Sequence, residues 1–269
     1  MRILFVGDVM GSRGRQMLTA YLPKLKGRYR PQVTIVNGEN AAGGRGITGK
    51  IYKEFLQAGA DVITMGNHVW DNRDIFEFID SAKKLVRPAN FPSPTTPGLG
   101  QVYVQVNQLK LAVINLQGNA LMGQTLDNPF HKADQLLAQI TQETKLIFID
   151  FHAETTAEKE AFAWYLDGRV SAVIGTHTHV QTNDARVLPQ GTAYLTDAGM
   201  TGAYDAVLGV QSEKSIERFL TQLPTRYVIK DNGHGVLGGC VVDLDDLNGH
   251  ARKIMPVVIN ADHPFSFDD

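Results

Sequence analysis

Residues 33–58 read VTIVNGENAAGGRGITGKIYKEFLQA, and they contain the pattern on which the predicted fold depends. The apolar, β-branched run at 33–37 is typical of a buried strand. A glycine-rich loop follows, and Thr48 then precedes the amphipathic segment 49–58 as a candidate helix N-cap. Strand, loop and helix in this order indicate one unit of a mostly parallel sheet covered by helices.

The same alternation of short apolar runs and amphipathic segments continues on both sides of this unit. Ser12 and Thr156 are the candidate N-caps of two further helices. Further strands are predicted at 2–7, 61–65, 102–106, 110–116, 146–151 and 172–175, and further helices at 13–26, 73–81, 132–142, 157–166 and 213–220.

Beyond residue 180 the pattern changes to short apolar runs separated by Gly, Asn and Pro, which predicts antiparallel strands. No linker, repeat or low-complexity tract divides the chain, so we expect residues 1–269 to form a single α/β domain. The late strands are predicted at 185–188, 192–196, 236–244 and 251–259.

The composition excludes several classes of protein. With 43% hydrophobic and 20% charged residues, the chain is neither disordered nor collagen-like. Its 26 Lys and Arg nearly balance 28 Asp and Glu, so the overall charge gives no signal for a nucleic-acid or membrane partner. The single cysteine, Cys240, and the absence of a long apolar run lead us to expect a cytoplasmic protein. Homo-oligomers are common, so the sequence is compatible with a dimer or tetramer.

Five of the predicted strands are followed directly by polar side chains of the types that commonly bind metals. In open α/β sheets, ligands bind beyond the carboxyl ends of parallel strands, so these side chains are expected to converge on one crevice. Carboxylate, amide and imidazole groups together suit zinc, manganese or iron better than an all-oxygen calcium site. In chain order, the residues are Asp8, Glu39 with Asn40, Asn67 with His68, His152, and His177 with His179.

The pair His177 and His179 carries the strongest signal of any single motif. Residues two apart on an extended segment point the same way, and His-x-His is a common chelating pair. Asp8, in contrast, is more typical of a turn or an N-cap than of a metal ligand when it is taken alone. The metal site is therefore predicted from the five strand ends together.

Two carboxylates lie close to His152 in the sequence. Asp150 is two residues before it and would share its face of a regular strand, and Glu154 extends the set. Either one would orient the imidazole from behind, or would be a turn-linked carboxylate without a role in the site.

The glycine-rich loop after the second strand resembles a phosphate-binding loop only in part. Residues 44–50 match the spacing Gly-x4-Gly-Lys, but Ile51 stands where a hydroxyl should follow, so we do not expect nucleoside-triphosphate hydrolysis. A glycine-rich loop that opens onto a helix N-terminus still suits an anion. Gly43, Gly44 and Arg45 are therefore candidate substrate contacts.

Taken in order, the strand-end motifs resemble those of the calcineurin-like metallophosphoesterase superfamily. Three departures are visible, because Met10 stands in place of the first histidine, Glu39 in place of the bridging aspartate, and Val69 after His68. With these departures the chain resembles one bacterial branch, the 2',3'-cyclic-nucleotide 2'-phosphodiesterases. The stretches that match this branch are NGENAAGG at 37–44, GNHVWD at 66–71 and TDAGMTG at 196–202.

The resemblance implies a four-layer α-β-β-α sandwich, in which two mixed β-sheets are flanked by helices. It also implies two divalent metal ions per chain, with iron or manganese favoured over zinc or magnesium. His68 would not coordinate a metal and would donate a proton. One metal would be bound by Asp8, Glu39, Asn40 and His179, and the other by Glu39, Asn67, His152 and His177.

These residues together predict a metal-dependent phosphoric diester hydrolase. Two metals about 3.5–4 Å apart would clamp the phosphoryl oxygens and lower the pKa of a bridging water, which then attacks as hydroxide. The leaving alkoxide would take a proton from an imidazole, for which His68 is the candidate. The branch implies small phosphodiesters as substrates, with 2',3'-cyclic nucleotides opened to 3'-nucleotides.

Two other functions are compatible with the same motifs. A nucleotide- or metal-sensing regulator would keep the site and turn over little. A metal-dependent hydrolase of another bond, such as an amidohydrolase, would also contain His-x-His, but there the pair typically opens the first strand of a barrel. Here His177 and His179 lie two-thirds along the chain, which favours the phosphodiesterase.

Overall fold

Strand β1 (Arg2–Val6) shows how the sequence builds the layers of the computed structural model, which describes residues 1–267. Successive side chains of a strand point to opposite faces of its sheet. Leu4 and Val6 therefore pack under the outer helices, whereas Ile3 and Phe5 pack against a second sheet. The ring of Phe5 lies 5.3 Å from the ring of Phe148, across the interface between the two sheets. Burial on both faces explains why the apolar run is continuous.

The first sheet has seven strands in the order β11-β12-β1-β2-β3-β4, with β13 paired to β12. Strands β1 to β4 are parallel, and β12 runs antiparallel to β1. Helices α1 (Gly11–Tyr29) and α2 (Gly49–Ala58) cover its outer face. The other strands are β2 (Val33–Asn37), β3 (Val62–Thr64), β4 (Leu85–Val86), β11 (Thr201–Ala203), β12 (Gly235–Leu244) and β13 (Ala251–Ile259).

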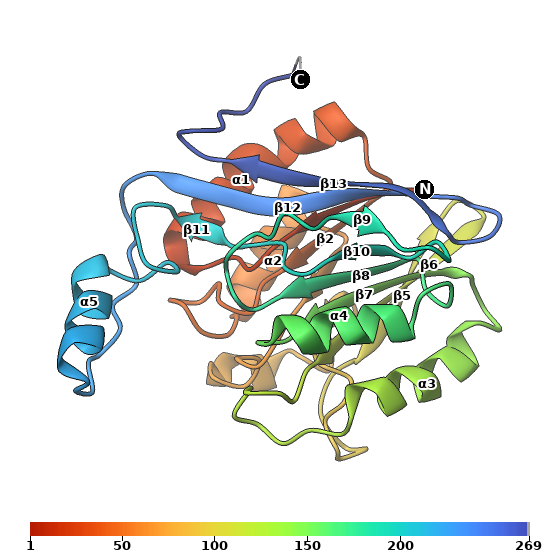
Figure 1. Cartoon of the computed structure of the whole chain (residues 1–269), viewed down its shortest axis with the longest axis horizontal. Helices are drawn as coiled ribbons and strands as arrows, with labels where there is room; N and C mark the ends of the chain where they lie inside the picture. Colours follow the sequence, from red (N-terminus) through yellow and green to blue (C-terminus); the bar gives the residue numbers. More distant parts are fainter. Residues whose placement is uncertain (268–269) are drawn as a thin grey trace.

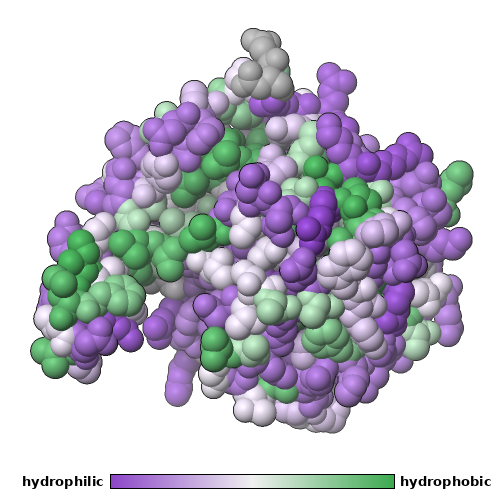
Figure 2. All heavy atoms as spheres, viewed as in Figure 1, coloured by the Kyte–Doolittle hydropathy of each residue, from purple (hydrophilic) through white to green (hydrophobic). Residues whose placement is uncertain are grey.

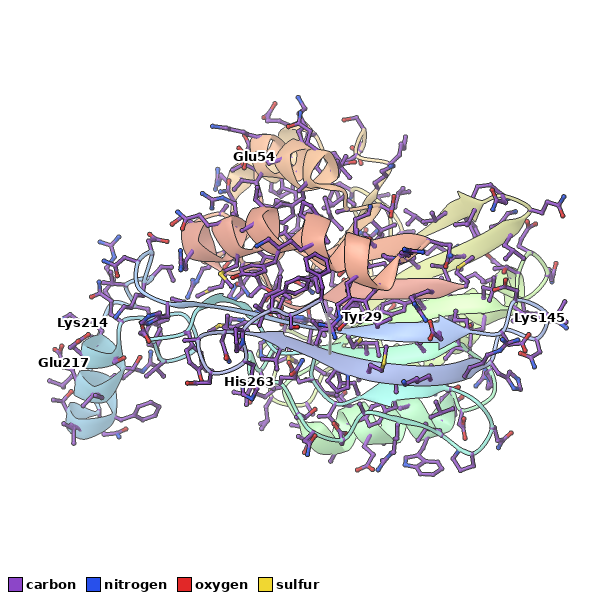
Figure 3. The ribbon with its side chains drawn as sticks, turned by 90° about the horizontal axis from the view of Figure 1, so that it is seen from above. Tyr29, Glu54, Lys145, Lys214, Glu217 and His263 are labelled. Carbon is purple, nitrogen blue, oxygen red and sulfur yellow. The ribbon has the colours of Figure 1, made fainter. Side chains whose placement is uncertain are left out.

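The second sheet has six strands in the order β5-β6-β7-β8-β10-β9. Helices α3 (Pro129–Ile140) and α4 (Thr156–Tyr165) pack on its outer face. Figures 1 and 3 show the two sheets stacked between the helices, which confirms the expected four-layer sandwich. The strands are β5 (Gln101–Val106), β6 (Leu109–Gln117), β7 (Leu146–His152), β8 (Ala172–Thr176), β9 (Arg186–Val187) and β10 (Ala193–Leu195).

Several predicted elements differ from those of the structure. The helix predicted at 73–81 is wrong, because only a short 3-10 helix, η1 (Arg73–Glu77), forms there. Strand β10, predicted among the antiparallel strands, pairs antiparallel with β9 as expected, but its other edge pairs parallel with β8. Strands β4 and β11 are not predicted, since two or three residues show no period.

The predicted N-caps are correct at one helix of three. The side chain of Thr48 accepts a hydrogen bond from the backbone N–H of Ile51 and caps α2, as predicted. Helix α1 begins after Met10, however, which places Ser12 inside the helix. Helix α4 is capped by the preceding threonine, Thr155, rather than by Thr156.

Residues 204–234, which we call the arm, project from the body of the molecule with α5 (Ser212–Thr221) at their tip (Figure 1). Figure 3 shows Lys214 and Glu217 of α5 well away from the sheets. At the base of the arm, the N–H of Tyr204 donates to the carbonyl of His234 at 2.8 Å. Across residues 1–267, no helix combines the length and the apolar character that crossing a membrane requires.

Candidate metal centre

The two sheets contribute different kinds of ligand to one site. The first sheet supplies the carboxylates and amides, from the loops after β1, β2 and β3. The second sheet supplies the imidazoles, from the end of β7 and the loop after β8. From the first sheet come Asp8, Glu39, Asn40 and Asn67, and from the second come His152, His177 and His179.

Two groups of three side chains could each hold a metal ion, and both groups include Glu39. The ligand atoms of Glu39, His152 and His177 all lie within 4.8 Å of one another, and so do those of Asp8, Glu39 and His179. These groups are buried or half-buried. The sharing of Glu39 is the arrangement that a dinuclear centre with one bridging carboxylate requires.

The two amides lie beside these groups. The Nδ2 atom of Asn40 is 3.1 Å from Nε2 of His179. The Oδ1 atom of Asn67 is 2.8 Å from Nε2 of His152. The structure therefore brings all seven predicted ligand residues together, and their binding of metal stays a prediction.

Asp150 orients His152 through a threonine that the sequence analysis does not identify. The buried Asp150 carboxylate accepts a hydrogen bond from the hydroxyl of Thr176 at 2.6 Å. Since the hydroxyl hydrogen is used in that bond, its oxygen accepts from Nδ1 of His152 at 2.8 Å. This bond turns the other ring nitrogen, Nε2, toward the centre. Metal-binding histidines are commonly oriented in this way, by a hydrogen bond at the nitrogen that does not face the metal.

The other two imidazoles also have a polar neighbour at the nitrogen that faces away from the centre. Nε2 of His177 lies 3.0 Å from a carboxylate oxygen of Glu154. Nδ1 of His179 donates to the backbone carbonyl of Leu208 at 3.3 Å. Each imidazole therefore presents one nitrogen to the centre and is fixed by the other.

The atoms that face the centre need a cation to satisfy them. Nε2 of His152 lies 2.8 Å from Oδ1 of Asn67, 3.0 Å from Nδ1 of His177 and 3.2 Å from Oε2 of Glu39. One N–H cannot serve three acceptors well, whereas a metal ion among them would serve all of them. In addition, Oδ1 of Asp8 is buried without a hydrogen-bond partner among the described residues. The residues present thus fit a metal centre.

The charges of the site support the same conclusion. Burial, together with the like charge of Glu39, raises the pKa of Asp8 well above its usual value although His152 opposes this. Burial by itself would lower the pKa of His152, but the carboxylates of Glu39 and Asp8 prevail and raise it to about 9. Burial would likewise raise the pKa of Glu39, but the nearby His152 prevails and lowers it. Two buried carboxylates this close disfavour each other's ionised form, and a bound cation would relieve that repulsion.

The loop that carries His177 and His179 is strained and held by a buried ion pair. These residues have φ values of 105° and 66°, which residues other than glycine rarely adopt. Between them, the N–H of Thr178 donates to the Asp197 carboxylate at 3.0 Å. The same carboxylate oxygen lies 2.7 Å from Nζ of Lys159, and both side chains are fully buried. Asp197 could have been found from the sequence, because it directly follows the predicted strand 192–196, just as the predicted metal ligands follow their strands.

Glycine at position 66 keeps space open inside the centre. A Cβ atom there would lie 2.2 Å from Oε2 of Glu39 and 2.4 Å from Nε2 of His152. We expect Gly66→Ala to lower the metal content to less than half of that of the wild-type protein, because the added methyl group displaces the side chains of both Glu39 and His152. Elemental analysis of the purified variant measures this. Gly27→Ala is the control, since a Cβ there meets nothing closer than 4.0 Å, and an unchanged metal content in Gly66→Ala would contradict the prediction.

A cavity of about 970 Å³ opens above the centre. His68 and the three predicted substrate contacts, Gly43, Gly44 and Arg45, line it. The Nδ1 atom of His68 donates to the Asp71 carboxylate at 2.8 Å, and the guanidinium of Arg45 lies 3.8 Å from the same carboxylate. The predicted substrate contacts and the predicted proton donor are therefore neighbours at the mouth of one cavity. Residues of the arm, which the sequence analysis does not predict as part of the site, form its outer wall.

Comparison with known proteins places these features in a family. The sequence model of the YmdB-like protein family matches residues 4–257. A Bacillus subtilis protein named 2',3'-cyclic-nucleotide 2'-phosphodiesterase is 58% identical over 98% of this chain and 99% of its own length. A crystal structure of a novel phosphatase from Mycoplasma pneumoniae has a TM-score of 0.91 with 34% identity, over 97% of this chain and 93% of that one. A hypothetical protein from Thermus thermophilus has a TM-score of 0.89 with 39% identity, over 97% and 99% of the two chains.

Proposed function

The chain belongs to the family of YmdB-like proteins, and on this premise we propose that it hydrolyses phosphodiesters with two divalent metal ions and opens 2',3'-cyclic nucleotides at the 2' ester. The observation that carries the proposal is the pair of ligand groups that share Glu39 at the floor of the cavity. The name of the Bacillus subtilis relative, which aligns over nearly the whole chain, supports the substrate and the 3'-nucleotide product.

The residues of the two sheets would hold the metal ions. When bound, the ions supply positive charge to the phosphoryl oxygens and lower the pKa of a water molecule. The mixed oxygen and nitrogen donors suit manganese or iron, which we propose as the native metals. We propose Asp8, Glu39, Asn40 and His179 as the ligands of one ion, and Glu39, Asn67, His152 and His177 as those of the other.

His68 is placed to give a proton to the leaving group. Asp71 accepts the hydrogen of its Nδ1 atom, which fixes the ring and leaves Nε2 as the nitrogen that can serve the substrate. The side chain of His68 keeps 27% of its surface exposed and lines the cavity. We propose that it protonates the 2' oxygen as the P–O bond breaks.

The mouth of the cavity suits an anionic substrate. The side chain of Arg45 is 66% exposed, so its guanidinium can pair with a phosphodiester that approaches. A Cβ at Gly43 would meet no atom within 4 Å, so the loop leaves open space beside the arginine. We propose that this loop positions the diester over the centre. The single thiol, Cys240, is buried and free, which fits action in the reducing cytoplasm.

The proposed function is tested by incubating the protein with Mn²⁺ or Fe²⁺ and 2',3'-cyclic AMP, and by following the products with ³¹P NMR. We expect 3'-AMP, because cleavage of the 2' ester leaves the phosphate on the 3' oxygen. Release of 2'-AMP would contradict the proposed regiochemistry. Tight binding of the nucleotide without product would instead identify a regulator.

We expect His68→Ala to lower kcat by about 10²–10⁴-fold, the usual contribution of a general acid, and to leave about two metal ions per chain. Turnover and elemental analysis are measured on the same preparation. His131→Ala is the matched control, because His131 is exposed on α3 and has no part in the site. A fall in metal content that parallels the fall in turnover would show that His68 acts as a ligand or a scaffold residue.

A further inference from the structure

The cavity is larger than the cyclic phosphate needs. At about 970 Å³ it lies near the upper end of the ~300–1,000 Å³ range of pockets that hold small ligands. The metal centre occupies only its floor, where Glu39 and His177 lie. The opposite wall is built by the arm, from Val207 to Ile229. Under the proposed function, the part of the substrate that faces this wall is the nucleoside.

The arm is attached to the rim of the metal centre, so the position of its side chains is defined. Ile229 forms an antiparallel bridge with Val210. The N–H of Lys230 donates to the carbonyl of Gly209 at 2.9 Å. Ile229 also packs so closely on the substrate loop that a Cβ at Gly44 would lie 2.5 Å from its Cδ1 atom. Leu208, beside this bridge, is the residue whose carbonyl fixes His179.

Two residues before Ile229, the arm presents an aromatic ring together with a cation. The guanidinium carbon of Arg218 lies 4.9 Å from the centre of the Tyr227 ring. Tyr227 nevertheless keeps 42% of its surface exposed. Within residues 1–267, neither side chain makes a hydrogen bond or an ion pair with another residue. Figure 2 shows apolar side chains gathered on the arm, where Phe219, Leu220 and Leu223 are exposed.

This combination is suited to a nucleobase. An aromatic ring stacks with any base, and an arginine held against the ring adds a second flat, cationic surface. A small diester without a base has no flat ring to stack on the aromatic face, so it gains nothing from the Tyr227 ring. Stacking needs no hydrogen bonds to the base, so the ring can accept different bases.

We propose that Tyr227, held against Arg218, is the surface on which the nucleobase of the substrate stacks. Tyr227 is then a specificity-determining residue that makes the enzyme prefer nucleoside phosphodiesters over other small diesters. This inference rests on the proposed function, since it assigns the part of the substrate that lies farthest from the metal centre.

The test compares two substrates with the same reacting ring. Ethylene phosphate has the five-membered cyclic diester of 2',3'-cyclic AMP but no nucleoside, and ³¹P NMR follows its hydrolysis. We expect Tyr227→Ala to lower kcat/KM for 2',3'-cyclic AMP by about 10-fold or more, mainly through KM, as expected for one lost stacking contact. Turnover of ethylene phosphate should stay within about twofold of the wild type, because that substrate does not reach the arm. Tyr227→Phe should restore the wild-type values, since it keeps the ring.

Tyr103→Ala is the matched control, because Tyr103 is 40% exposed and has the Lys110 ammonium 5.3 Å from its ring centre, but lies on strand β5. The proposal would be overturned if Tyr227→Ala lowered kcat/KM equally for both substrates or for neither. It would also be overturned if Tyr227→Phe lowered kcat/KM for 2',3'-cyclic AMP as much as Tyr227→Ala does. If the wild type cleaves neither substrate, the proposed function fails. Equilibrium dialysis with 3'-AMP then decides the inference by itself, with a Kd raised about 10-fold in Tyr227→Ala supporting it and an unchanged Kd overturning it.

Discussion

Glu39→Gln is expected to abolish binding of both metal ions and to lower kcat/KM by more than about 10³-fold. This loss exceeds the ~10–100-fold loss that follows mutation of a residue that only hydrogen-bonds to a metal ligand. The reason is geometric, because Glu39 belongs to both groups of candidate ligands. The substitution keeps the shape of the side chain and removes its charge. A neutral amide cannot balance two divalent ions, so both positions lose affinity together.

The same variant has a signature that does not depend on turnover. A metal that binds only the folded protein stabilises it by about 2.7 kcal/mol when its concentration is about 100 times the dissociation constant. Mn²⁺ should therefore raise the melting temperature of the wild type and leave that of Glu39→Gln unchanged. The matched control is Glu54→Gln on the exposed face of α2, which should respond like the wild type. A Glu39→Gln variant that still binds one equivalent of metal with wild-type affinity would contradict the shared role of Glu39.

Lys159→Met is expected to lower the free energy of unfolding by about 3–5 kcal/mol, because it leaves the buried Asp197 carboxylate without its cation. Both partners are fully buried, and their closest atoms are 2.7 Å apart. The loss should extend to the site, since the same carboxylate oxygen accepts the N–H of Thr178 between the two histidines of the loop. We therefore expect weaker metal binding as well as lower stability, measured by urea denaturation and by metal titration.

The control for this substitution is Lys53→Met, which exchanges the same side chains at an exposed position of α2. It should change stability by less than about 0.5 kcal/mol. The double variant Lys159→Met, Asp197→Asn should recover part of the lost stability, because it removes the unpaired charge as well. If the free energy of unfolding of Lys159→Met lies within about 1 kcal/mol of that of the wild type, the ion pair does not stabilise the fold and the interpretation is wrong.

The sequence predicts most of the fold because its central strands are buried on both faces. Such strands are continuous apolar runs with polar residues at their ends, as at residues 33–37. The helix predicted at 73–81 fails for a tertiary reason. Phe76 stacks on Trp70, at 5.3 Å between ring centres, whereas Phe78 packs on Tyr52 at 5.7 Å. Phe76 and Phe78 thus pack against different residues, Trp70 and Tyr52. The helix prediction assumes that the apolar residues share one buried face, so it cannot anticipate this packing.

The candidate site is predicted in its inner part and not in its outer part. The inner residues follow apolar strands directly, so strand prediction is sufficient to find them. The outer partners depend on which strands become neighbours. Thr176 faces His152 because β7 and β8 pair in parallel with these two residues in register. The partner of His179 is the backbone carbonyl of Leu208, and since every residue has such a carbonyl, the sequence gives no signal for it. Asp150 is two residues from His152 in the sequence, but its effect passes through that threonine.

The division of the ligands between the sheets also has a consequence for how the protein matures. A chain whose two halves have not yet docked can offer a metal either oxygens or imidazoles, but never the full set. On the proposed metal binding, uptake of the ions would be a late step that follows docking of the two sheets, and a chelator should loosen the contact between the sheets before it unfolds either one.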